Sequence, residues 1–304
     1  MKRSSLFSIL SLVVLVFGLT SCGTLGKEAA SLMPKPTAQE LVQHEGKSTV
    51  ALVWDNIYNE DDEVSDIRPV CTAVWIDQTH ILTAAHCIKA VQERLQDRQD
   101  KKEANRKECN PLAALFGKCN PDETPEHKVI KLQDMPMHYF QWAESQGVSR
   151  DPSAIHLAKV VGWDQPKDLA LIEAVGDVMP PHEAVKLADN SPEMTAPVIV
   201  VGHPKGLYWT FMTGTVAGNR ATLPHLYVSR ENEDDPKISR QGPFLQIEAP
   251  VYFGNSGGGA FNDRGELVGI ASFLLGVPGE GFFVGVPVIR EFLTDQNFYP
   301  YSTK

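Results

Sequence analysis

The sequence predicts an all-β protein, built either as a barrel or as a sandwich. Short runs rich in β-branched and aromatic residues recur along the chain, and turn-forming residues separate them. Hydrophobic residues make up 42% of the chain, as in an ordinary soluble domain. The predicted strands are residues 49–54, 72–76, 128–132, 155–161, 169–174, 198–201, 209–216, 244–247, 267–273 and 282–286.

The N-terminus has the composition of an export signal. Met1-Lys2-Arg3 is followed by an apolar run from residue 6 to residue 19 and then by small residues up to Cys22. The run is shorter than the roughly 20 residues that span a bilayer, which disfavours a transmembrane anchor. We therefore predict a signal peptide at residues 1–21, a polar and irregular tether at 22–45, and one large domain at 46–304.

Three motifs contain the side chains of a possible catalytic triad. Gly254-Asn255-Ser256-Gly257-Gly258 holds a serine between glycines, which let the backbone turn sharply and expose the hydroxyl. Upstream, Thr83-Ala84-Ala85-His86-Cys87 follows an apolar run, and Asp168 opens another run at 168–172. Serine is a poor nucleophile by itself and needs a base and an orienting carboxylate. His86 and Asp168 are the candidates for these two roles.

The serine pentapeptide also fits the G-x-S-x-G nucleophile elbow of α/β-hydrolases. In those enzymes the acid and the histidine follow the serine in the chain. No histidine follows Ser256 in this sequence, and His86 and Asp168 both precede it. The order of the residues therefore excludes the α/β-hydrolase arrangement. A single motif could be only a glycine-rich turn, but three motifs in order favour a triad.

The order His86, Asp168, Ser256 and the sequences around these residues resemble the trypsin/chymotrypsin-like serine proteases. Asparagine before the serine and the segment Val200-Val201-Gly202-His203-Pro204-Lys205-Gly206-Leu207 are more similar to the bacterial Deg (high-temperature-requirement) branch. The resemblance extends over about residues 48–294. It implies two packed six-stranded antiparallel β-barrels with the active site between them and a C-terminal helix at about residues 287–295.

The resemblance also implies a mechanism. His86 takes the proton of Ser256 as the hydroxyl attacks a peptide carbonyl, and Asp168 orients the imidazole. The backbone N–H groups of Gly254 and Ser256 form the oxyanion hole. The base of the specificity pocket maps onto uncharged Pro250, so small to medium apolar side chains are expected there. The remaining pocket residues implied by the resemblance are Val251, Ser272, Phe273, Leu274 and Gly281.

The chain departs from the Deg pattern between His86 and Asp168, where 81 residues intervene. We predict an insertion at about residues 89–127. Its first part, residues 89–107, is rich in Glu, Gln, Arg and Lys and predicts an exposed helix. The insertion is either a tolerated surface decoration or a lid or docking surface beside the active site.

The five cysteines divide into one lipidation site and four candidates for disulfides. Leu19-Thr20-Ser21-Cys22 resembles a bacterial lipobox, which implies a lipid on Cys22. An even number remains in an exported chain, where disulfides persist. Two bridges are the simplest account: the protease resemblance pairs Cys71 with Cys87, and Cys109 with Cys119 would then close a local loop. A metal site formed by His86 with these cysteines is the alternative, but the spacing matches no zinc pattern, so we predict no metal and no cofactor.

The formal net charge of -10 disfavours nucleic acid or an anionic bilayer as an electrostatic partner. Acidic runs at residues 59–63 and 231–235 are more typical of solvated turns than of calcium sites. The expected partners are protein or peptide substrates, and a membrane reached only through the lipid. The expected location is the bacterial cell envelope, at the outer membrane facing the periplasm if the host is Gram-negative.

Two classes of function fit these observations. The first is an active, lipid-anchored serine endopeptidase, and the second is a catalytically silent or latent protease-like domain that binds a partner in the envelope. The intact set of His86, Asp168 and Ser256, with glycines on both sides of the serine, favours the enzyme.

Overall fold

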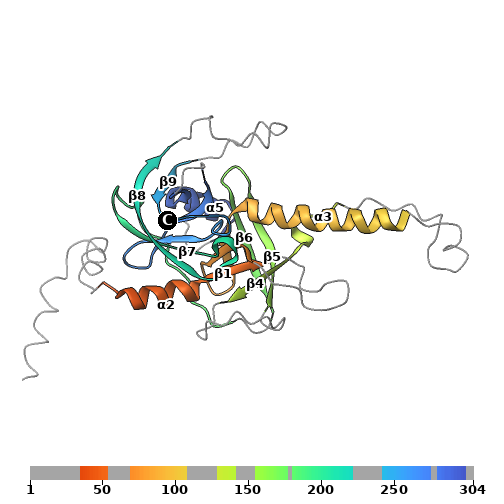
Figure 1. Ribbon diagram of the computed structural model, residues 1–304, viewed down its shortest axis with the longest axis horizontal. Helices are drawn as coiled ribbons and strands as arrows, with labels where there is room; N and C mark the ends of the chain where they lie inside the picture. Colours follow the sequence, from red (N-terminus) through yellow and green to blue (C-terminus); the bar gives the residue numbers. More distant parts are fainter. Residues whose placement is uncertain are drawn as a thin grey trace, which may run out of the picture. The chain divides into compact units, whose positions relative to one another are not determined.

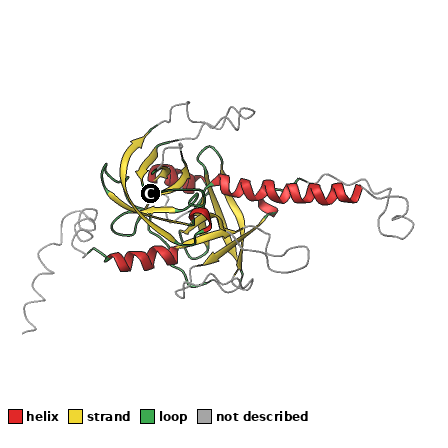
Figure 2. Cartoon of the chain, in the orientation of Figure 1, coloured by secondary structure: helices red, strands yellow, loops and turns green. Residues whose placement is uncertain are grey.

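The strands of the computed structural model close into two six-stranded antiparallel barrels (Figure 1, Figure 2). The structure describes residues 35–53, 69–107, 129–141, 155–176, 180–221, 242–274 and 279–298. The two-barrel, all-β architecture confirms the predicted fold class. From Pro36 onward, the described elements belong to one unit, Pro36–Lys304.

The first barrel has the strand order β1-β2-β3-β6-β5-β4. Side chains along the middle of β5 alternate between exposed and buried, as expected for a strand with one face on a core. Within that core, the rings of Trp75 and Tyr139 pack edge to face with centroids 5.6 Å apart. The strands are β1 (Thr49–Val53), β2 (Pro69–Trp75), β3 (His80–Thr83), β4 (Pro136–Gln141), β5 (Ile155–Asp164) and β6 (Leu169–Val175).

The second barrel has the order β10-β11-β12-β9-β8-β7. Its apolar core also includes Val74, Leu82 and Leu171 from the first barrel, so the two barrels share a buried interface. Residues from both barrels can therefore be held at fixed separations. The strands are β7 (Pro197–Gly202), β8 (Thr210–Arg220), β9 (Phe244–Glu248), β10 (Gly259–Phe261), β11 (Leu267–Phe273) and β12 (Glu280–Gly285).

Helices α3 and α5 lie where the sequence predicts helices. The charged run at 89–107 is part of α3 (Ala85–Lys107), which begins four residues earlier and so carries His86 in its first turn. Figure 1 shows α3 extending away from the barrels. α5 (Val286–Asp295) begins with Pro287 in its first turn, where a missing N–H costs no hydrogen bond. Among the described helices, none is long and apolar enough to cross a membrane.

The prediction of an irregular tether at 22–45 is wrong from Ala38 onward, because α2 (Ala38–Ser48) occupies this stretch. Thr37 caps the helix by accepting a hydrogen bond from the Glu40 N–H, and the Glu40 carboxylate accepts one from the Thr37 N–H. The sequence contains this T-x-x-E capping signal at residues 37–40. The tether prediction missed it because it relied on the polar composition of the segment. The signal peptide and residues 22–34 of the tether lie outside the described residues.

The strand prediction fails at three positions. Residues 129–131 have no regular structure and are followed by the 3-10 turn η1 (Leu132–Asp134), so the strand expected at 128–132 is instead β4, a few residues later. β4 has the sequence Pro-Met-His-Tyr-Phe-Gln, in which proline, histidine and glutamine interrupt the apolar residues, so a search for apolar runs passes over it. β3 and β10 were not predicted as strands because they have four and three residues, and their existence depends on pairing with their neighbours.

Candidate active site

The imidazole of His86 is hydrogen-bonded to the carboxylate of Asp168. His86 Nδ1 lies 3.0 Å from both Oδ1 and Oδ2, and the backbone N–H of His86 donates to Oδ1 over 3.0 Å. A carboxylate accepts only, so Nδ1 carries the proton and Nε2 keeps its lone pair. The Asp168 side chain is 3% exposed and that of His86 is 34% exposed, so the pair has a buried end and an accessible end.

Asp168 receives a further hydrogen bond from the second barrel. Ser272, on β11, donates its hydroxyl hydrogen to Asp168 Oδ2. The backbone of Asp168 is in the left-handed region, with φ of 53°, and its N–H donates to Gln165 O. The turn between β5 and β6 is thus wound tightly enough to direct the carboxylate toward both His86 and Ser272.

The glycines of the serine motif allow its loop to lie against neighbouring backbone. Gly254 has φ of +102°, and a Cβ there would lie 2.2 Å from the carbonyl oxygen of His203. Gly257 has φ of +80°, and a Cβ there would lie 2.2 Å from Thr72 O. Neither the backbone angle nor the available space admits a side chain at these two positions. The loop that carries Ser256 is therefore in direct contact with both barrels.

Two backbone N–H groups beside the serine remain available. Neither the Gly254 N–H nor the Ser256 N–H has an acceptor within the described ranges, whereas the intervening Asn255 N–H donates to Tyr252 O over 3.1 Å. The carbonyl of Phe253 accepts from the Lys205 N–H over 2.8 Å. Because a trans peptide directs its C=O and N–H to opposite sides, the Gly254 N–H points away from Lys205. Two unpaired donors flanking a serine hydroxyl can hold an oxyanion.

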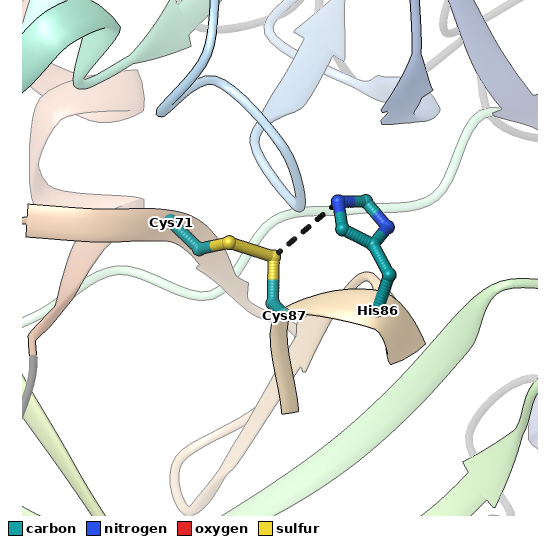
Figure 3. Close-up of side chains that lie close together, drawn as sticks. All are labelled: Cys71, His86 and Cys87. Carbon is teal, nitrogen blue, oxygen red and sulfur yellow. Dashed lines mark hydrogen bonds between the residues drawn. A yellow bond between two sulfur atoms is a disulfide. The ribbon is translucent and has the colours of Figure 1, made fainter. Parts of the chain in front are cut away.

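The Sγ atom of Cys87 lies close to both the imidazole of His86 and the main chain of Ser256. Figure 3 shows Cys87 Sγ facing His86 Nε2, and the two atoms lie 3.9 Å apart. The same sulfur lies 3.6 Å from Ser256 O. No hydrogen bond joins Ser256 Oγ to His86 Nε2, nor to any other residue in the described part of the chain. Ser256 thus lies beside His86 without a hydrogen bond between their side chains in the described part of the chain.

Cys87 is joined to Cys71 by a disulfide that connects β2 to the first turn of α3. This is the pairing that the family resemblance implies. The bond holds the helix that carries His86 against the strand that lies under the serine loop. The three ligand atoms of Cys71, His86 and Cys87 lie within 4.8 Å of one another, but the disulfide occupies both thiols. Cys22, Cys109, Cys119 and both acidic runs lie outside the described residues.

The predicted pocket residues do not all have the same environment. Val251 is buried and packs toward Gly281, where an added Cβ would lie 3.0 Å from Val251 Cγ2. Phe273 is partly buried and stacks on Phe282 with ring centroids 5.1 Å apart, and Leu274 also packs against the second-barrel core. Pro250, expected at the pocket base, is exposed.

Neutral groups lie behind the serine loop. Burial lowers the pKa of His203 to about 3, and its Nδ1 accepts from the Trp209 N–H over 2.9 Å. The buried amide of Asn255 places its Nδ2 3.8 Å from Met212 Sδ. His203 is therefore an uncharged core residue rather than a second catalytic base.

Sequence reasoning missed two residues that contact the serine loop. Thr72 donates its hydroxyl to Gly254 O over 2.8 Å and its N–H to Ser256 O over 2.8 Å. The N–H of Lys205 bonds Phe253 O, as described above. Lys205 lies in a motif that the sequence does single out, but Thr72 is distant in the chain from residues 254–256, and its only signal is its place next to Cys71.

These features define a domain of the serine endopeptidase class, with two barrels and a histidine–aspartate pair beside a serine held by glycines. A family model described as trypsin-like peptidase domain matches residues 71–270, and the chain belongs to this family.

Curated relatives agree with this assignment. The chain is 33% identical over 150 residues to a "probable periplasmic serine endoprotease DegP-like" from Marinomonas sp. MWYL1, which covers 49% of this chain and 28% of the relative. It is 28% identical over 148 residues to a "serine protease HtrA-like" from Staphylococcus aureus USA300, which covers 48% of this chain and 19% of the relative. The matched region is thus less than a third of each relative's length.

Solved structures share the fold. A serine endoprotease from Yersinia pestis aligns with a TM-score of 0.50 at 18% identity, over 86% of this chain and 67% of that one. An inactive mutant form of Rv3671c from M. tuberculosis H37Rv aligns with a TM-score of 0.52 at 14% identity, over 88% of this chain and 98% of that one.

Proposed function

We propose that this chain is an exported serine endopeptidase that cleaves protein substrates through an acyl-enzyme formed on Ser256. The observation that carries the proposal is the hydrogen bond from His86 Nδ1 to Asp168, made beside a serine whose flanking N–H groups lack described acceptors. The bond leaves the lone pair of His86 Nε2 available to take a proton.

In the proposed reaction, Ser256 Oγ bonds to the carbonyl carbon of the peptide while its proton passes to His86 Nε2. The carbonyl oxygen becomes an oxyanion that accepts from the N–H groups of Gly254 and Ser256, which contribute about 2.7 to 4 kcal/mol each. His86 then protonates the leaving amine, and the C–N bond breaks. Water hydrolyses the resulting ester by the same proton route. Asp168 stays ionised and stabilises the imidazolium.

Labelling with a fluorophosphonate probe, alongside hydrolysis of a casein substrate, tests this proposal. We expect the wild type to be labelled and active, and Ser256→Ala to be unlabelled and inactive. His86→Ala should lose about 10^6-fold in kcat, the size of loss recorded for a serine protease with the same triad. Ser191→Ala, a serine outside the site, is the matched control and should behave as the wild type.

Labelling of Ser256→Ala at the wild-type rate would refute the assignment of the nucleophile. A folded wild type that neither reacts with the probe nor cleaves any protein would instead favour the silent binding domain. Circular dichroism and melting temperatures of all variants establish that lost activity does not reflect lost structure.

We further propose a preference for small to medium apolar residues before the scissile bond. Support comes from the apolar surroundings of Val251, Phe273 and Leu274. A lysine or arginine head group in such surroundings would lose its hydration without gaining a partner. Mapping cleavage sites on a denatured proteome tests the preference. A dominant Arg, Lys, Asp or Glu at that position would overturn it.

We propose, finally, that a lipid on Cys22 attaches the enzyme to the membrane of the cell envelope. The support is the lipobox-like sequence Leu19-Thr20-Ser21-Cys22 after an apolar signal run. The Cys22→Ser protein should lack the mass of the lipid. On cell fractionation it should be found in the soluble fraction instead of the membrane fraction. Wild-type mass and membrane retention in that variant would contradict the proposal.

A further inference from the structure

Thr72 makes two hydrogen bonds that connect the first barrel to the serine loop, and a third bond holds it within the first barrel. Its hydroxyl donates to Gly254 O over 2.8 Å, and its N–H donates to Ser256 O over 2.8 Å. Its own carbonyl accepts from Thr83 Oγ1 over 2.8 Å. Thr72 is fully buried on β2, so water does not compete for these bonds.

The bond to Gly254 O restrains a peptide that glycine alone leaves loose. Gly254 has no Cβ, and its φ of +102° is one of many angles open to glycine. The preceding peptide is held at its carbonyl by Lys205 N–H, and the following peptide is held at its carbonyl by the Thr72 hydroxyl. Gly254 is therefore held from both sides, by the second barrel and by the first. The Lys205 bond orients the peptide that carries the Gly254 N–H, and the Thr72 bond restricts rotation about the Gly254 Cα, so the two bonds together limit the directions open to that N–H.

We propose that the Thr72 hydroxyl is a positioning group for the oxyanion hole, and that it acts by holding the Gly254–Asn255 peptide. The inference rests on the proposed function, because it assigns Thr72 a role in stabilising the oxyanion formed on attack by Ser256. Thr72 touches neither the substrate nor the reacting atoms. Its effect belongs to the transition state, since the oxyanion exists only after attack has begun.

Thr72→Val tests the role because valine keeps the branched shape and removes the hydroxyl. With a peptide amide substrate, for which KM approximates the dissociation constant, we expect kcat to fall roughly 10- to 100-fold with KM within twofold of the wild type. The affinity for a peptide boronic acid, whose anionic adduct resembles the tetrahedral intermediate, should fall in parallel with kcat. Thr72→Ser retains the hydroxyl and should restore kcat to within about threefold of the wild type.

A second pair of variants allows for poor folding of the valine form. Thr72→Ser and Thr72→Ala differ only by the hydroxyl, and the serine form should have the higher kcat at equal KM. Thr294→Val is the matched control, because it removes a threonine hydroxyl from a backbone carbonyl on α5, away from the site. It should leave kcat unchanged.

The inference is overturned if Thr72→Val keeps kcat within twofold, or if Thr72→Ser and Thr72→Ala have equal kcat. Equal losses in kcat and in substrate affinity would also overturn it, because they indicate general damage to the site. The Gly254 amide signal in the nuclear magnetic resonance spectrum separates this failure from failure of the proposed function. It should shift or broaden in Thr72→Val but not in Thr294→Val, even if the wild type cleaves no peptide.

Discussion

At the scale of single residues, the proposed chemistry depends on the orientation of the Asp168 carboxylate. Asp168 accepts from the side chain and the backbone of His86 and from Ser272, so its carboxylate has little freedom to turn. The histidine proton is thereby assigned to Nδ1, and the accessible nitrogen becomes a base. One hydrogen-bond acceptor in the interior thus determines the protonation of an atom at the surface.

Asp168→Asn should lower kcat about 10^4-fold while leaving the fold intact, because an amide N–H donating to Nδ1 would move the imidazole proton to Nε2. Steady-state hydrolysis of a peptide amide, with a melting curve for each protein, measures both effects. Asp189→Asn is the control, since Asp189 is an exposed aspartate outside the site. A loss of less than tenfold in Asp168→Asn would count against the triad.

At the scale of elements, strand β2 contacts both parts of the candidate site. It supplies Cys71 to the disulfide that holds α3, and Thr72 to the serine loop. His86 and Ser256 are therefore both held against one short strand, although they belong to different barrels. Helix α2 leads into β1, the neighbour of β2. It contains Glu45, whose two buried carboxyl oxygens have no hydrogen-bond partner among the described residues.

Removal of the Cys71–Cys87 bond should destabilise the domain by about 3 kcal/mol, because the bond closes a loop of 16 residues and restricts the unfolded chain. The double variant Cys71→Ala, Cys87→Ala should melt roughly 5 to 12 °C below the wild type in calorimetry. The control is Ser191→Ala, measured in the same buffer, which should melt as the wild type. A double variant as stable as the wild type would argue that the bond contributes nothing to the fold.

Glu45 on α2 should make stability fall as pH rises. It is fully buried, neither carboxyl oxygen has a described hydrogen-bond partner, and burial raises its pKa from 4.5 to about 8. Between these values the unfolded state ionises while the folded state stays protonated. Each pH unit in this window therefore removes up to about 1.4 kcal/mol, and above pH 8 the loss stops growing.

Glu45→Met removes this titration and fills similar space with apolar atoms. We expect its melting temperature to exceed that of the wild type by an amount that grows from about pH 4.5 to pH 8 and is then constant. Thermal unfolding of the two proteins across this range measures the difference, in which the other titrating groups cancel. A pH-independent difference would show that Glu45 does not titrate in this window.

At the scale of the whole molecule, ion pairs supplement the apolar interface between the barrels. Lys167, in the turn before Asp168, places Nζ 2.7 Å from Asp295 and 3.3 Å from Glu291 on α5, and 3.1 Å from Asp164. The hydrogen bond to Asp295 is the main reason that the pKa of Lys167 is raised. The turn that carries Asp168 is thereby connected to the helix packed on the second barrel.

Lys167→Met should lower stability by about 1 kcal/mol, a modest amount because Asp295 and Glu291 are more than half exposed and remain hydrated without their partner. Methionine keeps the packing of the lysine stem. Chemical denaturation at low and at high sodium chloride measures the free energy of unfolding of both proteins. The difference in this free energy between the variant and the wild type should become smaller in high salt. A gap that widens in high salt would contradict an electrostatic origin.

The candidates for nucleophile, base and orienting carboxylate can be predicted from the amino-acid sequence alone, because Ser256 lies among glycines and the order of the three residues excludes the α/β-hydrolase arrangement. The sequence also predicts the all-β class, since most strands appear as local apolar runs. These properties depend on neighbours in the chain, and a sequence records them directly.

The contacts of Thr72 and Lys205 and the short strands β3 and β10 depend on the folded chain and could not be predicted from the sequence. Residue 72 meets residue 254 because two closed barrels bury a common face, and this depends on the packing of side chains far apart in the chain. A three-residue strand such as β10 exists because β7 and β11 pair with it on both sides. Backbone hydrogen bonds of this kind leave no signature in residue type, so they become visible only once the chain is folded.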